Sequence, residues 1–111
     1  MHKLATICLL LSTSIAWADA DPRTQRAWKA KCAPCHGEDG KGQTDAGKKL
    51  GVADMSAPAW QKKVTDEQIK SSMQKGVKVQ RNGKEVEMPA FADLKPDQLE
   101  GLLKFVRGFA K

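Results

Sequence analysis

The chain has 111 residues and a formal net charge of +6, with three Phe, three Trp and no Tyr. This length predicts one small domain, and so few aromatic residues predict a core that needs a bound apolar group to be complete. The positive charge favours acidic partners, and we expect no nucleic-acid partner.

Residues 1–20 predict a secretory signal peptide. Lys3 lies in a short basic start, residues 4–15 are apolar, and small residues around Ala18 match a cleavage site. The apolar stretch is too short to span a bilayer comfortably, which favours a cleaved signal peptide; an uncleaved membrane anchor is the alternative. We expect export to the periplasm, with a thylakoid-like lumen as the other compartment, and a mature domain over residues 21–111.

The mature chain is predicted to begin with a helix. Asp21 and Pro22 form a start signal, with Asp as N-cap and Pro at the first helical position. Residues 23–35 contain no Gly and continue the helical pattern. Trp28 lies four residues before Cys32, so we expect it on the same helix face, as a core aromatic residue.

The run Cys32-Ala33-Pro34-Cys35-His36 has the attachment signature of c-type haem. Two intervening residues let both sulfurs reach neighbouring pyrrole rings from one helical turn, and the adjacent imidazole then points at the iron from the same side. We therefore predict one haem c, covalently bound through Cys32 and Cys35, with His36 as an iron ligand. Because His36 is the only histidine of residues 21–111, iron ligation by two histidines and catalysis by a separate histidine are excluded.

Two other interpretations of these cysteines stay open. Cys-x-x-Cys is also a redox-active disulfide motif, which would make the protein a secreted thiol-disulfide oxidoreductase. That motif normally follows a buried strand, whereas a polar helix is predicted here. A structural zinc site is weaker, because three donors would crowd into one turn with no fourth partner evident.

Residues 37–51 contain five Gly and are expected to form a loop close to a ligand surface. A phosphate-binding loop is a weak alternative, since no strand precedes the run and no Gly-Lys-Ser/Thr follows. An iron-bound histidine usually donates its free ring N–H to a nearby acceptor, and this loop is expected to supply the acceptor.

The middle of the chain is predicted to hold one turn-rich segment and one helix. Residues 54–60 form turns with one short helical turn, and Trp60 either packs at the core edge or donates its indole N–H to a haem propionate. Thr65 to Gln68 is a capping box that opens a helix ending near Lys75, with Gly76 as its stop. Ile69 and Met73 share the buried face of this helix.

Two further elements follow. Residues 77–88 resemble a small hairpin turning at Asn82-Gly83. Pro96 opens a terminal amphipathic helix, and its apolar residues recur at three- and four-residue spacing as far as Phe109.

The iron also needs a sixth ligand or an open position, and residues 21–111 offer three methionines. Met73 shares a helix face with Ile69, where methionine is more often packing. Met88 precedes Pro89, which favours extended backbone that can place a thioether over a flat ring. We predict Met88 as the ligand, with Met55 and Met73 as alternatives.

These motifs resemble the small class I c-type cytochromes of bacteria along the whole mature chain. Trp28 matches an aromatic position of the first helix, residues 32–37 match the haem motif, residues 54–60 the middle loop, residues 88–91 the distal methionine loop and residues 96–109 the last helix.

The resemblance implies an all-α cytochrome c fold, in which short middle helices and loops wrap one covalent haem. The first and last helices cross, with Trp28 and Phe105 near the crossing, and His36 and Met88 lie on opposite haem faces. One departure is that residues 47–50 read Gly-Lys-Lys-Leu, whereas the family commonly has Gly-Pro-x-Leu there and the proline carbonyl accepts the histidine N–H. The Lys48 carbonyl can accept the same bond without the stiffness of proline.

A saturated iron leaves one-electron transfer as its chemistry, so we predict a soluble, monomeric electron carrier without enzyme activity. A haem sensor or peroxidase-like protein with an open iron site is the further alternative. Partners are expected to be redox proteins with acidic docking surfaces, and the membrane is reached only through a partner complex. On this protein, the residues expected to face such acidic surfaces are lysines: Lys41, Lys48, Lys49, Lys62 and Lys63.

Overall fold

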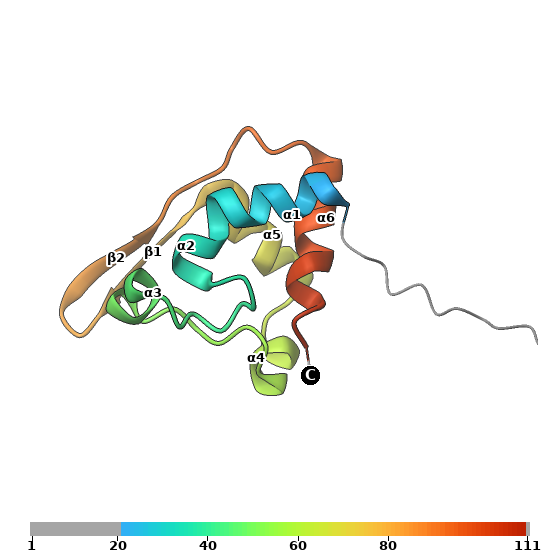
Figure 1. The fold of residues 1–111 in the computed structure, drawn as a ribbon. Coiled ribbons are helices and arrows are strands. Elements are labelled where there is room, and N and C mark those ends of the chain that lie inside the picture. The colour runs from blue at the N-terminus through green and yellow to red at the C-terminus, as the bar shows by residue number, and fades with distance from the viewer. Residues whose placement is uncertain (1–20, 111) are drawn as a thin grey trace, which may run out of the picture.

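The computed structural model describes residues 21–110 (Figure 1). The predicted signal peptide lies outside the described residues. In chain order the elements are α1 (Pro22–Ala27), the π-helical turn η1 (Trp28–Cys32), α2 (Ala33–His36), α3 (Asp45–Leu50), α4 (Pro58–Lys63), α5 (Asp66–Lys75), β1 (Val77–Arg81), β2 (Lys84–Met88) and α6 (Pro96–Arg107).

The first helical span runs without a break from α1 through η1 to α2. Its start is as predicted, because the Asp21 side chain accepts a hydrogen bond from the Arg23 N–H at 2.9 Å. The regular helix expected over residues 23–35 is wrong in one detail. At η1 the Ala33 N–H bonds to the Trp28 carbonyl, five residues back, which is the spacing of a π-turn. Such turns are common at functional sites, and this one ends at Cys32, the first residue of the haem motif.

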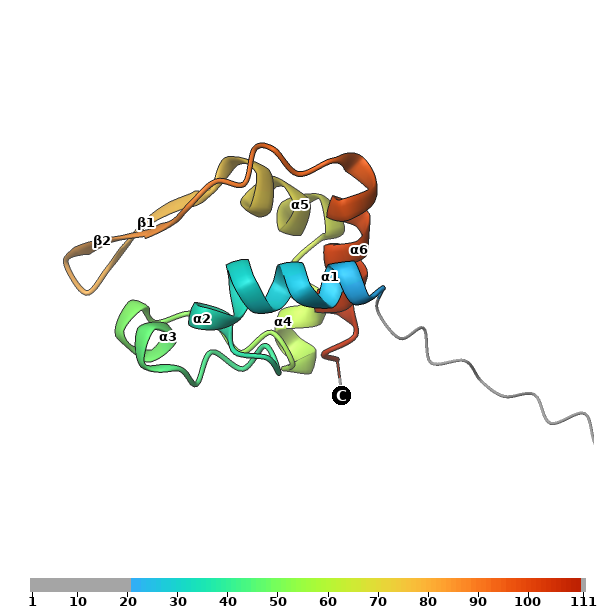
Figure 2. The same ribbon diagram turned by 45° about the horizontal axis from the view of Figure 1, so that its top comes forward.

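The first and last helices cross, as the resemblance implied (Figure 2). They come close where Gly101 of α6 faces Thr24 of α1, since a Cβ at Gly101 would lie 2.7 Å from the Thr24 hydroxyl oxygen. Beside this crossing, the buried Trp28 ring stacks with Phe105 and Phe109 at centroid distances of 5.3 and 5.2 Å. Phe109 was expected on the helix, but it lies beyond the end of α6 and reaches the cluster from a turn.

Helix α5 forms as predicted. The Thr65 hydroxyl accepts from the Gln68 N–H and the Gln68 side chain accepts from the Thr65 N–H, so both halves of the capping box are present. Ile69 and Met73 are its buried residues. The Met73 carbonyl also accepts the Phe91 N–H at 2.8 Å, which ties the segment after β2 to this helix.

The all-α class needs a correction, because the chain also contains a two-stranded antiparallel sheet, β1 with β2. The sheet is the hairpin expected over residues 77–88. Asn82 and Gly83 adopt φ of 52° and 75°, the conformation that a tight two-residue turn requires. Figure 1 shows the hairpin reaching away from the crossing of α1 and α6, toward α3. The fold is thus helical with one small sheet.

The loop expected over residues 37–51 is wrong in its second half, which forms α3. Thr44 caps this helix by accepting the Gly47 N–H, and Gly51 ends it in the left-handed conformation. Within residues 21–110, no helix is both long enough and apolar enough to cross a membrane.

Candidate functional site

A cavity of about 300 Å³ opens between the first helical span, α5 and the hairpin. It is lined mainly by apolar side chains, and it brings together all five residues that the sequence predicted for a haem site: Cys32, Cys35, His36, Trp60 and Met88. Its volume is at the lower end of the range for ligand pockets. Segments that lie more than 50 residues apart in the sequence therefore meet around one space.

Cys32 and Cys35 enter the cavity from the first helical span. Neither cysteine forms a disulfide. Cys32 is buried and Cys35 is half-buried, and burial raises the pKa of the Cys32 thiol to about 11. A redox-active cysteine requires the opposite change, a lowered pKa that yields a thiolate at neutral pH. Two thiols on one helical turn, held beside an apolar cavity, are instead the pair that haem attachment needs.

His36 ends α2 and also lines the cavity. Burial lowers the pKa of its imidazole, so the ring is neutral at neutral pH, which is the form that binds a metal. Its buried Nδ1 atom has no hydrogen-bond partner among residues 21–110. The Lys48 carbonyl, the predicted acceptor, instead accepts the Gly51 N–H at the end of α3.

Thr44 and Gly47 support the cysteine motif, and sequence analysis missed both roles. The Thr44 hydroxyl donates to the Cys35 carbonyl at 2.9 Å while accepting the Gly47 N–H at 2.8 Å. Gly47 packs so closely on the Cys35 carbonyl that a Cβ there would clash with it. The available signal was local: a Thr followed by Asp is a helix N-cap, which would have indicated the start of α3 but not its contact with Cys35.

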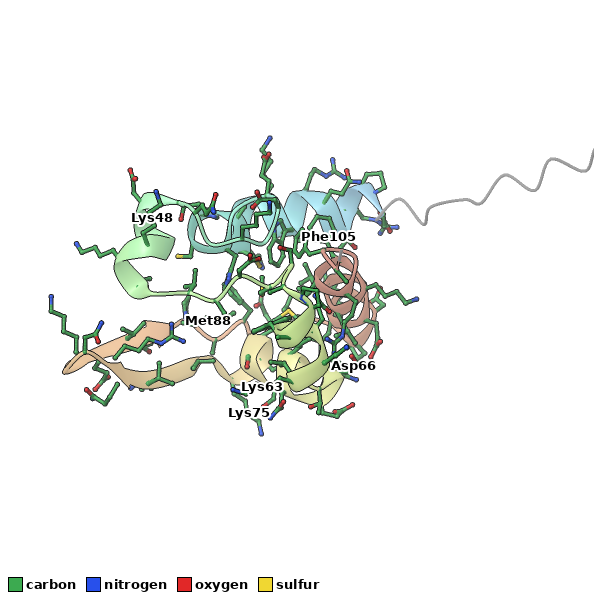
Figure 3. The ribbon with its side chains drawn as sticks, turned by 90° about the horizontal axis from the view of Figure 1, so that it is seen from below. Lys48, Lys63, Asp66, Lys75, Met88 and Phe105 are labelled. Carbon is green, nitrogen blue, oxygen red and sulfur yellow. The ribbon has the colours of Figure 1, made fainter. Side chains whose placement is uncertain are left out.

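Three methionine side chains line the cavity, and they differ in their surroundings. Met55 and Met73 are buried in the core, whereas Met88 is half-buried. Met88 lies in extended backbone, as its position before Pro89 predicted, and is the last residue of β2. In Figure 3 its side chain points from the hairpin toward the layer formed by α2 and α3. The core positions of the other two leave Met88 the least committed to packing.

Trp60 belongs to α4 and lies half-buried against the core, so the packing role predicted for it is present. It also lines the cavity. Its indole N–H has no hydrogen-bond partner among the described residues. Binding of a haem propionate by this N–H therefore stays a prediction.

The site's own atoms fit a haem. Two thiols lie on one turn, the neighbouring imidazole is neutral and has a ring nitrogen without a partner, and a thioether lies on another wall of the cavity. The walls are apolar, as the porphyrin ring requires. Soft sulfur and imidazole donors are those that hold haem iron in electron-transfer proteins.

Comparisons with known proteins find similarity to c-type cytochromes. Residues 19–106 match the family described as cytochrome c oxidase, cbb3-type, subunit III. Among solved structures, the KustC0563 c-type cytochrome is similar at 32% identity and a TM-score of 0.63, covering 79% of this chain and 98% of that chain. A single-residue mutant of the same cytochrome is similar at 31% identity and a TM-score of 0.63, covering 78% and 96%. No curated protein matches the chain.

The family match spans most of the chain, and the similar structure is matched over nearly its whole length. The chain therefore belongs to the c-type cytochromes, proteins of haem-based electron transfer that carry haem c, in the family described as cytochrome c oxidase, cbb3-type, subunit III.

Proposed function

We propose that this protein is a periplasmic, monomeric one-electron carrier with a single haem c, attached through Cys32 and Cys35 and ligated by His36 and Met88. The observation that carries the proposal is the shared cavity. It places the two thiols and the imidazole on the first helical span and the Met88 thioether on the hairpin. When bound there, the haem supplies one-electron exchange between ferric and ferrous iron.

The residues around the haem have three tasks. Cys32 and Cys35 would hold it, His36 and Met88 would supply its iron ligands, and the mainly apolar walls would exclude water. A neutral thioether favours the ferrous state relative to a second imidazole and so raises the reduction potential. With His36 and Met88 both bound to the iron, no position would remain for a substrate, which is why we propose a carrier and not an enzyme.

The experiment is an absorption spectrum of the chain produced with c-type maturation machinery, before and after Met88→Ala. We expect sharp bands of low-spin ferrous haem, and a methionine-to-iron band near the red end that Met88→Ala removes. Met73→Ala is the matched control, because Met73 lines the same cavity from α5, and it should keep the band.

Each alternative has its own outcome in this experiment. Persistence of the band in Met88→Ala would assign the ligand to Met55 or Met73. Binding of carbon monoxide by the native ferrous protein at neutral pH would favour a sensor or peroxidase-like protein. A colourless protein after maturation would revive the thiol-disulfide oxidoreductase.

We also propose acidic redox partners that dock by charge. Lys48 and Lys49 are exposed at the end of α3, close to Leu50 and Val52 of the cavity wall. Neither lysine has an ion-pair partner among residues 21–110. Rates of electron transfer to an acidic partner should fall with rising ionic strength. Rates that do not depend on salt would refute charge-guided docking.

A further inference from the structure

Two charged side chains line the cavity without a role in the proposed function, Glu87 of β2 and Arg81 at the end of β1. The Arg81 guanidinium has no hydrogen-bond or ion-pair partner among residues 21–110. A guanidinium presents N–H donors in a planar fork that matches a carboxylate with two parallel hydrogen bonds. An unpaired Arg at a mainly apolar cavity is therefore suited to a ligand that is apolar and also carries a carboxylate.

Strand alternation explains how Arg81 comes to line the cavity. Val77, Val79 and Arg81 occupy alternate positions of β1 and so share one face, and Met88 and Val86 stand opposite the two valines in the register. All five residues line the cavity. The inner face of the hairpin is thus an apolar stripe with Met88 at one end and a positive charge at the other.

The Arg81 side chain reaches from the hairpin to the end of α3. A Cβ at Gly51 would be 3.4 Å from the Arg81 Nη1 atom. Leu50 and Val52, on either side of Gly51, line the cavity as well. The Arg81 side chain therefore lies between the hairpin and α3 at one edge of the cavity.

The other charged groups near this edge are identifiable. Lys84 stands opposite Arg81 in the register but does not line the cavity. Lys48 and Lys49 lie in the last turn of α3, and Glu87 lines the cavity next to Met88, at the other end of the hairpin. The positive charge at this edge thus comes from several residues, of which Arg81 alone lines the cavity.

We propose that Arg81 binds a propionate of the haem and thereby holds the hairpin over the cavity. The inference rests on the proposed function, since it requires a haem in this cavity. Haem is an apolar ring with two carboxylates, which matches an apolar stripe that ends in a guanidinium. Arg81 acts as a positioning residue: the ion pair fixes the hairpin, and with it the strand that carries Met88.

The test is Arg81→Gln in the full-length, haem-loaded protein. We expect a lower reduction potential, because a positive charge that disfavours ferric iron is lost. We also expect the pH-dependent step of the potential to move upward by about one pH unit, because a carboxylate without its cationic partner protonates more easily. Amide hydrogens of β1 and β2 should exchange about tenfold faster, since a charge-assisted hydrogen bond is missing.

Two further variants make the test specific. Lys78→Gln removes the same charge from the opposite face of β1, where Lys78 is exposed and does not line the cavity, so it should leave the pH-dependent step and the exchange rates unchanged. Arg81→Lys keeps the charge but loses the planar fork of N–H donors. Its reduction potential should stay close to that of the native protein, whereas the amide hydrogens of β1 and β2 should exchange faster. If Arg81→Gln does not load haem, Arg81→Lys still tests the role of the guanidinium.

Equal behaviour of Arg81→Gln and Lys78→Gln would overturn the role of Arg81 while the native spectrum still supports the haem protein. Absence of a haem spectrum in the native protein would overturn the proposed function and this inference together. The two failures are therefore distinguishable from the same set of samples.

Discussion

At the scale of single residues, Trp28 joins three parts of the molecule. Its side chain is 3% exposed, and its indole N–H donates to the Gly37 carbonyl at 3.0 Å. Its ring also packs on Phe105 and Phe109, and lies 6.0 Å from the His36 ring. One side chain thus holds the first helical span to the last helix and to the loop that follows the haem motif.

We predict that Trp28→Phe lowers the free energy of unfolding by about 2 kcal/mol. The loss combines a buried hydrogen bond with the smaller volume of the new ring. Urea denaturation of the haem-loaded protein measures it. Phe109→Leu is the control, because it thins the same cluster without removing a hydrogen bond, and it should lose about half as much. Equal losses would mean that the bond to Gly37 contributes nothing.

Among the elements, α6 is joined to the middle of the chain by a polar network around Arg107. The Arg107 guanidinium donates to the Gln61 and Val64 carbonyls at 2.8 and 2.7 Å and pairs with Asp66 at 2.8 Å. Gln61 in turn donates to the carbonyls of Met55 and Val106. These bonds fix the approach of α4 and the start of α5 to α6, and with them the cavity wall that carries Met55 and Trp60.

We predict that Arg107→Lys destabilises the protein by about 2 kcal/mol, although the charge is kept. An ammonium on a flexible chain cannot reach two carbonyls and a carboxylate together, so partly buried acceptors lose their donors. The midpoint of urea denaturation is the measurement. Arg26→Lys on α1 is the matched control, since Arg26 is exposed and unpaired within residues 21–110, and it should change stability by less than about 0.5 kcal/mol. A similar midpoint shift in both variants would refute this role for Arg107.

On the scale of the whole molecule, the protein core and the cavity share side chains. Trp28, Cys32, Ile69, Met73 and Val106 are buried core residues that also line the cavity. Only Leu102 among the described residues has a side chain less than 2% exposed. A core of this kind is completed by what fills the cavity, and the rest of the chain is small for independent stability.

We predict that the haem-free chain is largely unfolded. Without the haem, the shared side chains would face water, and the buried area that remains is too small to offset the conformational entropy of the chain. Circular dichroism of protein made without maturation machinery should show most of the helical signal lost, compared with the haem-loaded protein. A native-like spectrum with a cooperative thermal transition would contradict this prediction.

The residue sequence by itself determined the features that depend on neighbours within a few positions. The Asp21 cap, the capping box of Thr65 and Gln68, and the turn at Asn82 and Gly83 are all present as predicted. The chemistry of the motif from Cys32 to His36 was likewise readable, because it depends on residue types at fixed spacing. Such interactions are local, so the residue types alone favour one conformation.

Only the tertiary structure decided which distant residues meet. The contact of Thr44 with the Cys35 carbonyl and the position of Arg81 against Gly51 join segments that no periodicity connects. The π-turn at Trp28 likewise has no distinct sequence pattern, since bonding to the fourth or to the fifth residue back uses the same residue types. These features depend on how helices and the hairpin pack around one cavity, where long-range contacts outweigh local preference.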